Sequence, residues 1–145
     1  MTRNININLN SKFLKFNGLY LSLDKTFRIN IDNNIIFPAN ATLGDDNNNK
    51  FIKVTSIGDW VAYCEGGGGI VGGGSGGWIS IRESKESLST DTVIGGDGDG
   101  FWVFVTFNGS TATRSKTITI TETTTNNVIE LFVTQQGQLG GDLNF

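Results

Sequence analysis

The sequence contains no histidine, one cysteine and one proline among its 145 residues. Without an imidazole, neither a Ser-His-Asp triad nor a histidine-activated cysteine nucleophile can be built. A zinc site is nearly excluded as well, because histidine and cysteine are its usual ligands. The single Cys64 cannot form an internal disulfide, and we interpret it as a small buried apolar residue. We therefore expect a fold that needs neither an oxidising compartment nor a cofactor.

Long apolar runs and a strong charge of either sign are also missing. No stretch is long enough to span a membrane, and the first ten residues lack the continuous apolar core of a secretory signal. If Met1 is the native start, we expect no export by the general route. The net charge is −3, so attraction to phosphate backbones is weak and we expect no nucleic-acid partner. A slight basic excess in the first 30 residues could meet an acidic protein surface.

Residues typical of strands and turns are abundant instead. Glycine, asparagine, threonine, isoleucine and valine dominate, and short apolar runs are separated by turn residues without helical periodicity. We predict an all-β chain built around an antiparallel β-sandwich. Its parts are an N-terminal strand-rich arm at 1–32, a sandwich at 33–138 and a C-terminal tail at 139–145.

The expected arm consists of alternating segments. Ile5, Ile7 and Leu9 alternate with asparagines, which is typical of a strand with one buried face. The dipeptide Asn17-Gly18 separates two further apolar runs and predicts a hairpin. Because such a unit is too short to hold a core alone, we interpret it as a docking segment.

A glycine run separates two expected strands of the sandwich. Nine of the twelve residues from Gly66 to Gly77 are glycine, including Gly69 and Gly74. We predict a flexible loop, since glycine loses the most backbone entropy on ordering. A phosphate site is disfavoured, because no Gly-Lys-Ser/Thr ending and no helix pattern follow.

The carboxylates give no catalytic assignment. The candidates for an acid-base pair lie in polar or glycine-rich turns, where solvated surface charge is the usual state. They are Glu65, Glu83, Glu86, Asp97 and Asp99. Asp97 and Asp99, with Asp91, also raise the possibility of calcium, but the EF-hand spacing fails and a turn is favoured. We expect no catalytic residue and no metal ligand.

Aromatic side chains are the usual platforms for sugars. Either Phe101 or Trp102 must face outward if their strand is regular. We name Tyr63, Trp102 and Tyr20 as candidates for glycan contact, and we expect most other aromatic rings to be buried. Arg114 is interpreted as a residue that satisfies carbonyl groups at a corner of the sandwich.

An ordered set of short motifs resembles the BACON domain, an immunoglobulin-like module of Bacteroidetes proteins and their phages. The resemblance covers roughly residues 34 to 138, with Trp60 and Trp78 matching core tryptophans of the family. Its remaining elements are Ile35-Ile36-Phe37, Phe51-Ile52-Lys53-Val54, the glycine turn before Phe101, Asn108, Arg114, the Thr117 to Thr121 strand and Val133-Thr134-Gln135-Gln136-Gly137.

The resemblance implies an immunoglobulin-like sandwich of about seven strands and a non-enzymatic role. BACON domains occur beside glycoside hydrolases and have a proposed carbohydrate- or mucin-binding role. They also occur in crAss-like phages, whose virion proteins need no export signal. Our leading hypothesis is a phage virion protein, an auxiliary capsid or head-decoration subunit. Its arm would dock on capsid or other virion proteins in a homo- or hetero-oligomer, and its sandwich could meet host glycans.

Two alternatives stay open. The chain could be a secreted carbohydrate-binding module at the bacterial cell surface or in the periplasm, in which case an export signal would precede it. A BACON-like enzyme is the third hypothesis and would require hydrolysis that depends on a carboxylate such as Asp97 or Glu83.

Overall fold

The computed structural model describes residues 13–16, 19–22, 26–41, 46–69 and 77–139, and within these ranges the regular elements are strands and two short 3-10 turns. No helix in this part of the chain is long and apolar enough to cross a membrane. The predicted all-β fold is confirmed. The strands are β1 (Phe13–Phe16), β2 (Leu19–Ser22), β3 (Arg28–Ile29), β4 (Asn34–Phe37), β5 (Asn49–Thr55), β6 (Trp60–Tyr63), β7 (Ile79–Arg82), β8 (Thr92–Gly95), β9 (Gly100–Val105), β10 (Arg114–Glu122) and β11 (Val128–Gln135), with 3-10 turns η1 (Asp46–Asn48) and η2 (Gly67–Gly69).

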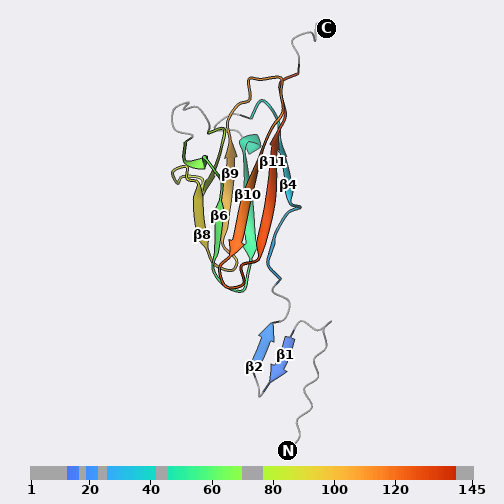
Figure 1. The fold of residues 1–145 in the computed structure, drawn as a ribbon, viewed down its shortest axis with the longest axis vertical. Coiled ribbons are helices and arrows are strands. Elements are labelled where there is room, and N and C mark those ends of the chain that lie inside the picture. Colours follow the sequence, from blue (N-terminus) through green and yellow to red (C-terminus); the bar gives the residue numbers. More distant parts are fainter. Residues whose placement is uncertain (1–12, 17–18, 23–25, 42–45, 70–76, 140–145) are drawn as a thin grey trace, which may run out of the picture.

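Two sheets form the sandwich (Figure 1). One sheet has the strand order β4-β11-β10-β6-β8 and the other the order β3-β5-β9-β7. Neighbouring strands are antiparallel except for β4, which runs parallel to β11. This parallel pairing is possible because β4 and β11 are separated by most of the chain, whereas strands joined by a tight turn must be antiparallel.

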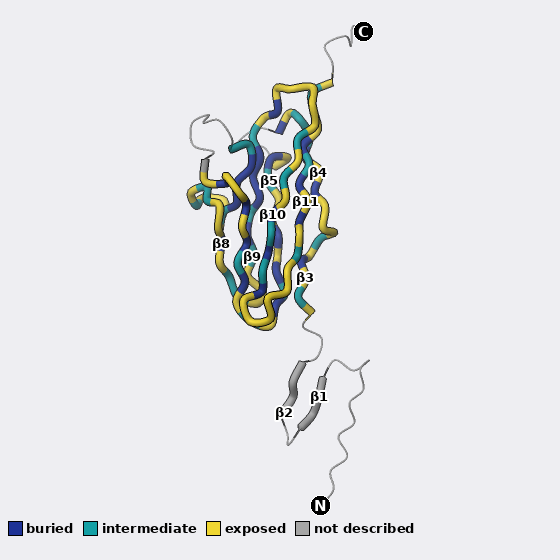
Figure 2. Tube along the Cα trace, in the orientation of Figure 1, coloured by how far each residue is buried: buried dark blue, intermediate teal, exposed yellow. Residues whose placement is uncertain are grey.

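The core lies between the sheets and follows the alternation of the strands (Figure 2). Every second residue is buried from Ile52 in β5, from Ile118 in β10 and from Leu131 in β11, as expected for strands with one face toward the interior. The inward residues of these three strands include Ile52, Val54, Ile118, Ile120, Leu131 and Val133, which have no exposed surface.

The N-terminal region divides into two parts. β1 and β2 pair with each other, Phe16 opposite Leu19, which confirms the predicted hairpin. β3, by contrast, pairs with β5 in the sandwich, and its Ile29 joins the core. The sequence prediction assigned Ile29 to the arm, so the boundary expected at residue 32 falls too late. Residues 1–12 and 140–145 lie outside the described residues.

Trp60 fills one end of the core. Its side chain has no exposed surface, and its ring centroid lies 5.8 Å from that of Phe101. The indole N–H donates to the carbonyl of Gly96 at 2.7 Å. The ring passes directly over Gly95, its partner across β6 and β8. The expected core position of Trp60 is confirmed, while Trp78 is partly buried and packs against the core.

Arg114 and Gln135 close a corner of the sandwich. Arg114 donates from Nε to Oε1 of Gln135 at 2.9 Å and from Nη2 to the carbonyl groups of Thr106 and Phe107. Its guanidinium also lies 4.7 Å from the ring centroid of Trp78. The predicted role of Arg114 in satisfying corner carbonyls is confirmed.

Candidate functional site

The outer surface of the four-stranded sheet carries three aromatic side chains. Phe51 comes from β5, and Trp102 and Phe104 come from β9. Because Phe101, Val103 and Val105 face the core, the alternation of β9 directs Trp102 and Phe104 outward. The structure thus resolves which of Phe101 and Trp102 faces outward. We call these three rings, together with Arg82 and Lys85, the aromatic face.

The strand register brings the rings together. Phe51 lies directly opposite Trp102, with ring centroids 5.1 Å apart and planes tilted by 46°. Trp102 and Phe104 follow along the same strand at 6.5 Å. Gly100 makes room for the Phe51 ring, since a Cβ atom there would lie 2.7 Å from its Cε2 and would also meet the Ile52 carbonyl. Phe51 keeps 37% of its surface exposed and is accessible to a ligand.

Two cations lie over the remaining rings. The Arg82 guanidinium stacks 4.1 Å from the centroid of Phe104, and the Lys85 ammonium lies 4.7 Å from that of Trp102. Phe104 is buried and Trp102 is half-buried, so Phe51 is the most exposed of the three rings. Arg82 also donates to the Lys85 carbonyl and to the Ser89 hydroxyl, which orders the segment after β7. Burial lowers the pKa of Arg82 below its ordinary value, but a guanidinium stays protonated at neutral pH. The face therefore presents aromatic carbon beside fixed N–H donors.

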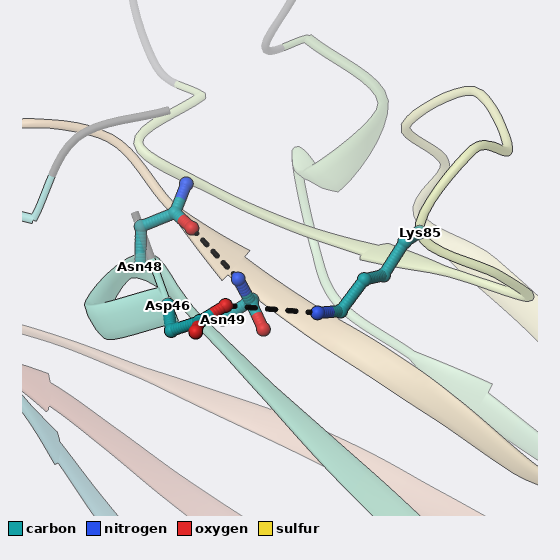
Figure 3. Close-up of polar contacts among 4 residues, drawn as sticks. All are labelled: Asp46, Asn48, Asn49 and Lys85. Atoms are coloured by element: carbon teal, nitrogen blue, oxygen red, sulfur yellow. Dashed lines mark hydrogen bonds and ion pairs between the residues drawn. The ribbon is translucent and has the colours of Figure 1, made fainter. Parts of the chain in front are cut away.

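Polar groups border the face beside Lys85 (Figure 3). The Lys85 ammonium points toward the Asp46 carboxylate, at 3.9 Å. Asn49 donates from its side-chain amide to Oδ1 of Asn48 at 2.9 Å. Both charged side chains are exposed, so their ion pair contributes little to stability. Hydrogen-bonding groups of both kinds thus lie next to the rings.

The other glycan-contact candidates do not join this face. Tyr63 is 46% exposed, as expected, but it lies on β6 in the opposite sheet, with Thr119 and Thr92 as its directly opposite neighbours. The Tyr20 side chain lies outside the described residues. Among the candidates whose side chains the structure describes, Trp102 alone lies directly opposite another aromatic residue, Phe51.

The glycine run is described only at its two ends. Gly66 has a φ of 74°, in the left-handed region that favours glycine. Gly69 ends η2, and Gly77 precedes Trp78. Gly74 lies outside the described residues, so flexibility of the loop stays a prediction.

The carboxylates considered for catalysis or calcium lie at the surface. Glu65, Glu83, Glu86, Asp97 and Asp99 are all exposed. Asp97 accepts the amide of Ser56 at 3.1 Å, and Asp99 accepts that of Gly96 at 2.8 Å, which holds the turn before β9. The favoured interpretation as a turn is confirmed. Across the described ranges, no group of three or more acidic, cysteine or histidine side chains could hold a metal ion.

Glu122 is a carboxylate that the sequence pattern did not single out. It ends β10 opposite Trp60, has no exposed surface, and neither carboxylate oxygen has a hydrogen-bond partner among the described residues. Its inward position continues the alternation of Ile118 and Ile120. The alternation alone could have placed Glu122 inside.

Comparisons with known proteins give a likeness of fold. No protein-family description and no curated protein matches the sequence. A Bacteroides ovatus GH5 xyloglucanase, solved with a XXXG heptasaccharide, matches 78% of this chain at 15% identity and a TM-score of 0.54. The chain corresponds to only 19% of that enzyme's length. A Bacteroides thetaiotaomicron protein matches 76% of this chain and 80% of its own length at 14% identity, with a TM-score of 0.43.

Cys64 is buried, and burial raises the pKa of its thiol to about 11. At pH 8 only about a thousandth of such a thiol is ionised, and the thiolate is the reactive form. We expect iodoacetamide to leave Cys64 unmodified in the native protein at pH 8 over hours and to modify it within minutes in 6 M guanidinium. Mass spectrometry measures both rates, and equal rates would contradict the buried position.

Proposed function

We propose that this chain is a non-enzymatic β-sandwich module that binds carbohydrate on its aromatic face. The observation that carries the proposal is the Phe51–Trp102 pair on the outer surface of the four-stranded sheet, where Phe51 is exposed and Trp102 is half-buried with Lys85 over its ring.

The chemistry of the face suits a sugar. Pyranose rings present C–H groups that pack on aromatic carbon, while their hydroxyl groups need hydrogen-bond partners. Phe51 and Trp102 offer the first, and the Lys85 ammonium with the Asp46 carboxylate offers donors and acceptors at the edge. Since Gly100 and the strand pairing fix the Phe51 ring, binding requires little ordering of the protein.

The surroundings of the acidic groups favour binding over catalysis. Asp46 is the carboxylate described beside Lys85 at the face, and its side chain is fully exposed. A general acid usually lies in a site that excludes water, whereas this carboxylate is in contact with solvent.

The biological setting is a separate proposal. A virion subunit that displays a glycan-binding sandwich, and a cell-surface carbohydrate-binding module, would both use such a face. The fold likeness to part of a xyloglucanase does not choose between them. Mass spectrometry of purified virions separates the two settings, because it detects the chain in particles only in the first.

A binding screen tests the function. The folded protein is tested for binding to mucin-type glycans, xyloglucan and other plant polysaccharides. The affinity for each glycan that binds is then measured by calorimetry. We expect at least one glycan to bind, and Trp102→Ala to weaken that affinity tenfold or more, about 1.4 kcal/mol. Tyr63→Ala removes an exposed ring from the opposite sheet and is the matched control, with a change below about twofold. Absence of any binding, or equal losses in both variants, would contradict the proposal.

A further inference from the structure

The outer face of the five-stranded sheet is almost free of charge (Figure 1). In its described strand pairs, the side chains that alternate away from the core include one charged residue, Glu130. The large hydrophobic side chains among them keep 46–66% of their surface exposed, and the remainder are mostly threonines. These hydrophobic residues are Ile36, Tyr63, Ile94, Val128 and Phe132. Exposed hydrophobic side chains gathered on one face are typical of a surface that contacts another protein.

The strand register arranges this outer face about β10, the central strand of the sheet. Thr119 lies directly opposite Glu130 of β11 on one side and Tyr63 of β6 on the other. The next outward position of β10 lies in the same way between Val128 and Val61. A two-fold axis along β10 exchanges the two sides, so a second copy on this axis lays its Glu130 over Tyr63 and its Val128 over Val61. The carboxylate then meets a phenol hydroxyl that can donate to it, and the two carboxylates stay apart.

A hollow of about 510 Å³ lies on the same face. β6 ends at Tyr63, so in the described part of the chain Ser115 and Thr117 pair with β11 but with no strand on their other side. Both residues line the hollow, which Glu65 and Phe132 also border. Because Thr117 lies directly opposite Phe132, the two-fold axis brings the second copy's Phe132 to the side of Thr117 where Glu65 lies. Each copy therefore offers an exposed ring and a recess for the ring of the other.

The size of the outer face suits a weak but specific contact between two copies. Five strands spaced about 4.8 Å apart make the face roughly 24 Å wide, and the outward residues of β10 extend over roughly 20 Å. Two such faces cover about 1,000 Å², which is the lower limit for a specific interface. Sheets also pack face to face with their strands nearly aligned. With one carboxylate on each side, little charge has to be removed from water.

We propose that the outer face of the five-stranded sheet binds a second copy of this chain in a two-fold symmetric dimer centred on Thr119. Phe132 of each copy enters the hollow of the other, and Tyr63 donates to the second copy's Glu130. The aromatic face belongs to the opposite sheet, so both aromatic faces stay exposed in the dimer. Dimer formation is thus independent of glycan binding.

Two matched phenylalanine variants of the full chain test this interface. Phe132→Ala removes a ring that is 49% exposed on the outer face, and Phe107→Ala removes one that is 53% exposed in the loop between β9 and β10. Sedimentation at increasing concentration is expected to show a monomer–dimer equilibrium for the unchanged protein. The dissociation constant should rise about tenfold or more in Phe132→Ala and less than about twofold in Phe107→Ala. A chain that stays monomeric at several hundred micromolar, or equal effects of the two variants, would overturn the proposal.

Cross-linking locates the symmetry axis. Thr119→Cys places a thiol on the axis, beside the same thiol of the second copy, whereas Ile57→Cys places one at an exposed position between β5 and β6. Native Cys64 is buried and does not compete for the reagent. A short bismaleimide should join Thr119→Cys into covalent dimers and leave Ile57→Cys monomeric, and equal yields would contradict an axis along β10.

Two further measurements separate the dimer from glycan binding. Trp102→Ala should leave the monomer–dimer equilibrium unchanged, because Trp102 lies on the opposite sheet. Phe132→Ala should likewise leave the affinity for an oligosaccharide unchanged. Loss of both properties in either variant would overturn the assignment of the two functions to separate faces.

Discussion

Gly95→Ala is expected to lower the free energy of unfolding by about 3 kcal/mol. A Cβ atom at this position would lie 2.8 Å from Cε2 and 2.9 Å from Cη2 of Trp60, and closer still to Cζ2. The indole cannot move away, because it is fully buried against Phe101 and its N–H is bonded to the Gly96 carbonyl. Overpacking a core costs about 1–3 kcal/mol, and displacement of the indole also weakens that hydrogen bond. Denaturation in urea, followed by tryptophan fluorescence, measures the change.

Gly96→Ala is the matched control for this prediction. A Cβ atom at Gly96 would meet Asp59 and Asp99 at 3.6 Å, an ordinary contact distance, and its φ is not in the left-handed region. We expect a change within about 0.5 kcal/mol, since a glycine-to-alanine change at a compatible site also restricts the unfolded chain. Similar losses in the two variants would show that Trp60 does not cover Gly95.

Gln135→Leu should destabilise the fold by about 2–4 kcal/mol. Gln135 has no exposed surface, and its Nε2 donates to the carbonyl groups of Pro38 at 3.1 Å and Thr106 at 2.8 Å. Its Oε1 accepts from Nε of Arg114. Leucine fills the space but leaves the Pro38 carbonyl and the Arg114 Nε without these partners, and each such buried group costs about 1–3 kcal/mol.

The adjacent glutamine provides the comparison for the corner. Gln136 is exposed, although its backbone N–H bonds to the Phe37 carbonyl. Gln136→Leu keeps that backbone bond, so the midpoint of unfolding should stay within about 0.5 kcal/mol of the parent protein. If Gln135→Leu proves as stable as Gln136→Leu, the hydrogen bonds of the corner do not stabilise it.

Local pattern predicted most of the strands. The alternation along β10 and β11 identified their buried faces, because one side of each strand faces the core over the part that carries the alternating apolar residues. The β1–β2 hairpin followed from Asn17-Gly18, which suits a two-residue turn. The place of β3 in the sandwich did not follow, since its pairing depends on β5, which local alternation does not identify as its partner.

The candidate site was predicted only in part. The alternation of β9 left Trp102 as an outward candidate, but its partner Phe51 is distant in sequence and meets it only through the register of β5 and β9. Arg82 and Lys85 lie in or after β7, and nothing local shows that their side chains cover the rings of β9. Tyr63 was correctly expected to be exposed, but local pattern could not place it in the other sheet. Sheet membership and register are tertiary properties, which short-range periodicity does not contain.

The indole N–H resonances of the three tryptophans give the most direct test of the aromatic face as a sugar site. Trp102 lies on the face, Trp60 is bonded to Gly96 inside the core, and Trp78 packs beside Arg114 at the corner. In a titration with the oligosaccharide that binds best, followed by ¹H–¹⁵N NMR, we expect the Trp102 indole signal to shift progressively. The Trp60 and Trp78 signals should stay in place. Saturable binding that leaves the Trp102 signal unmoved would contradict the account.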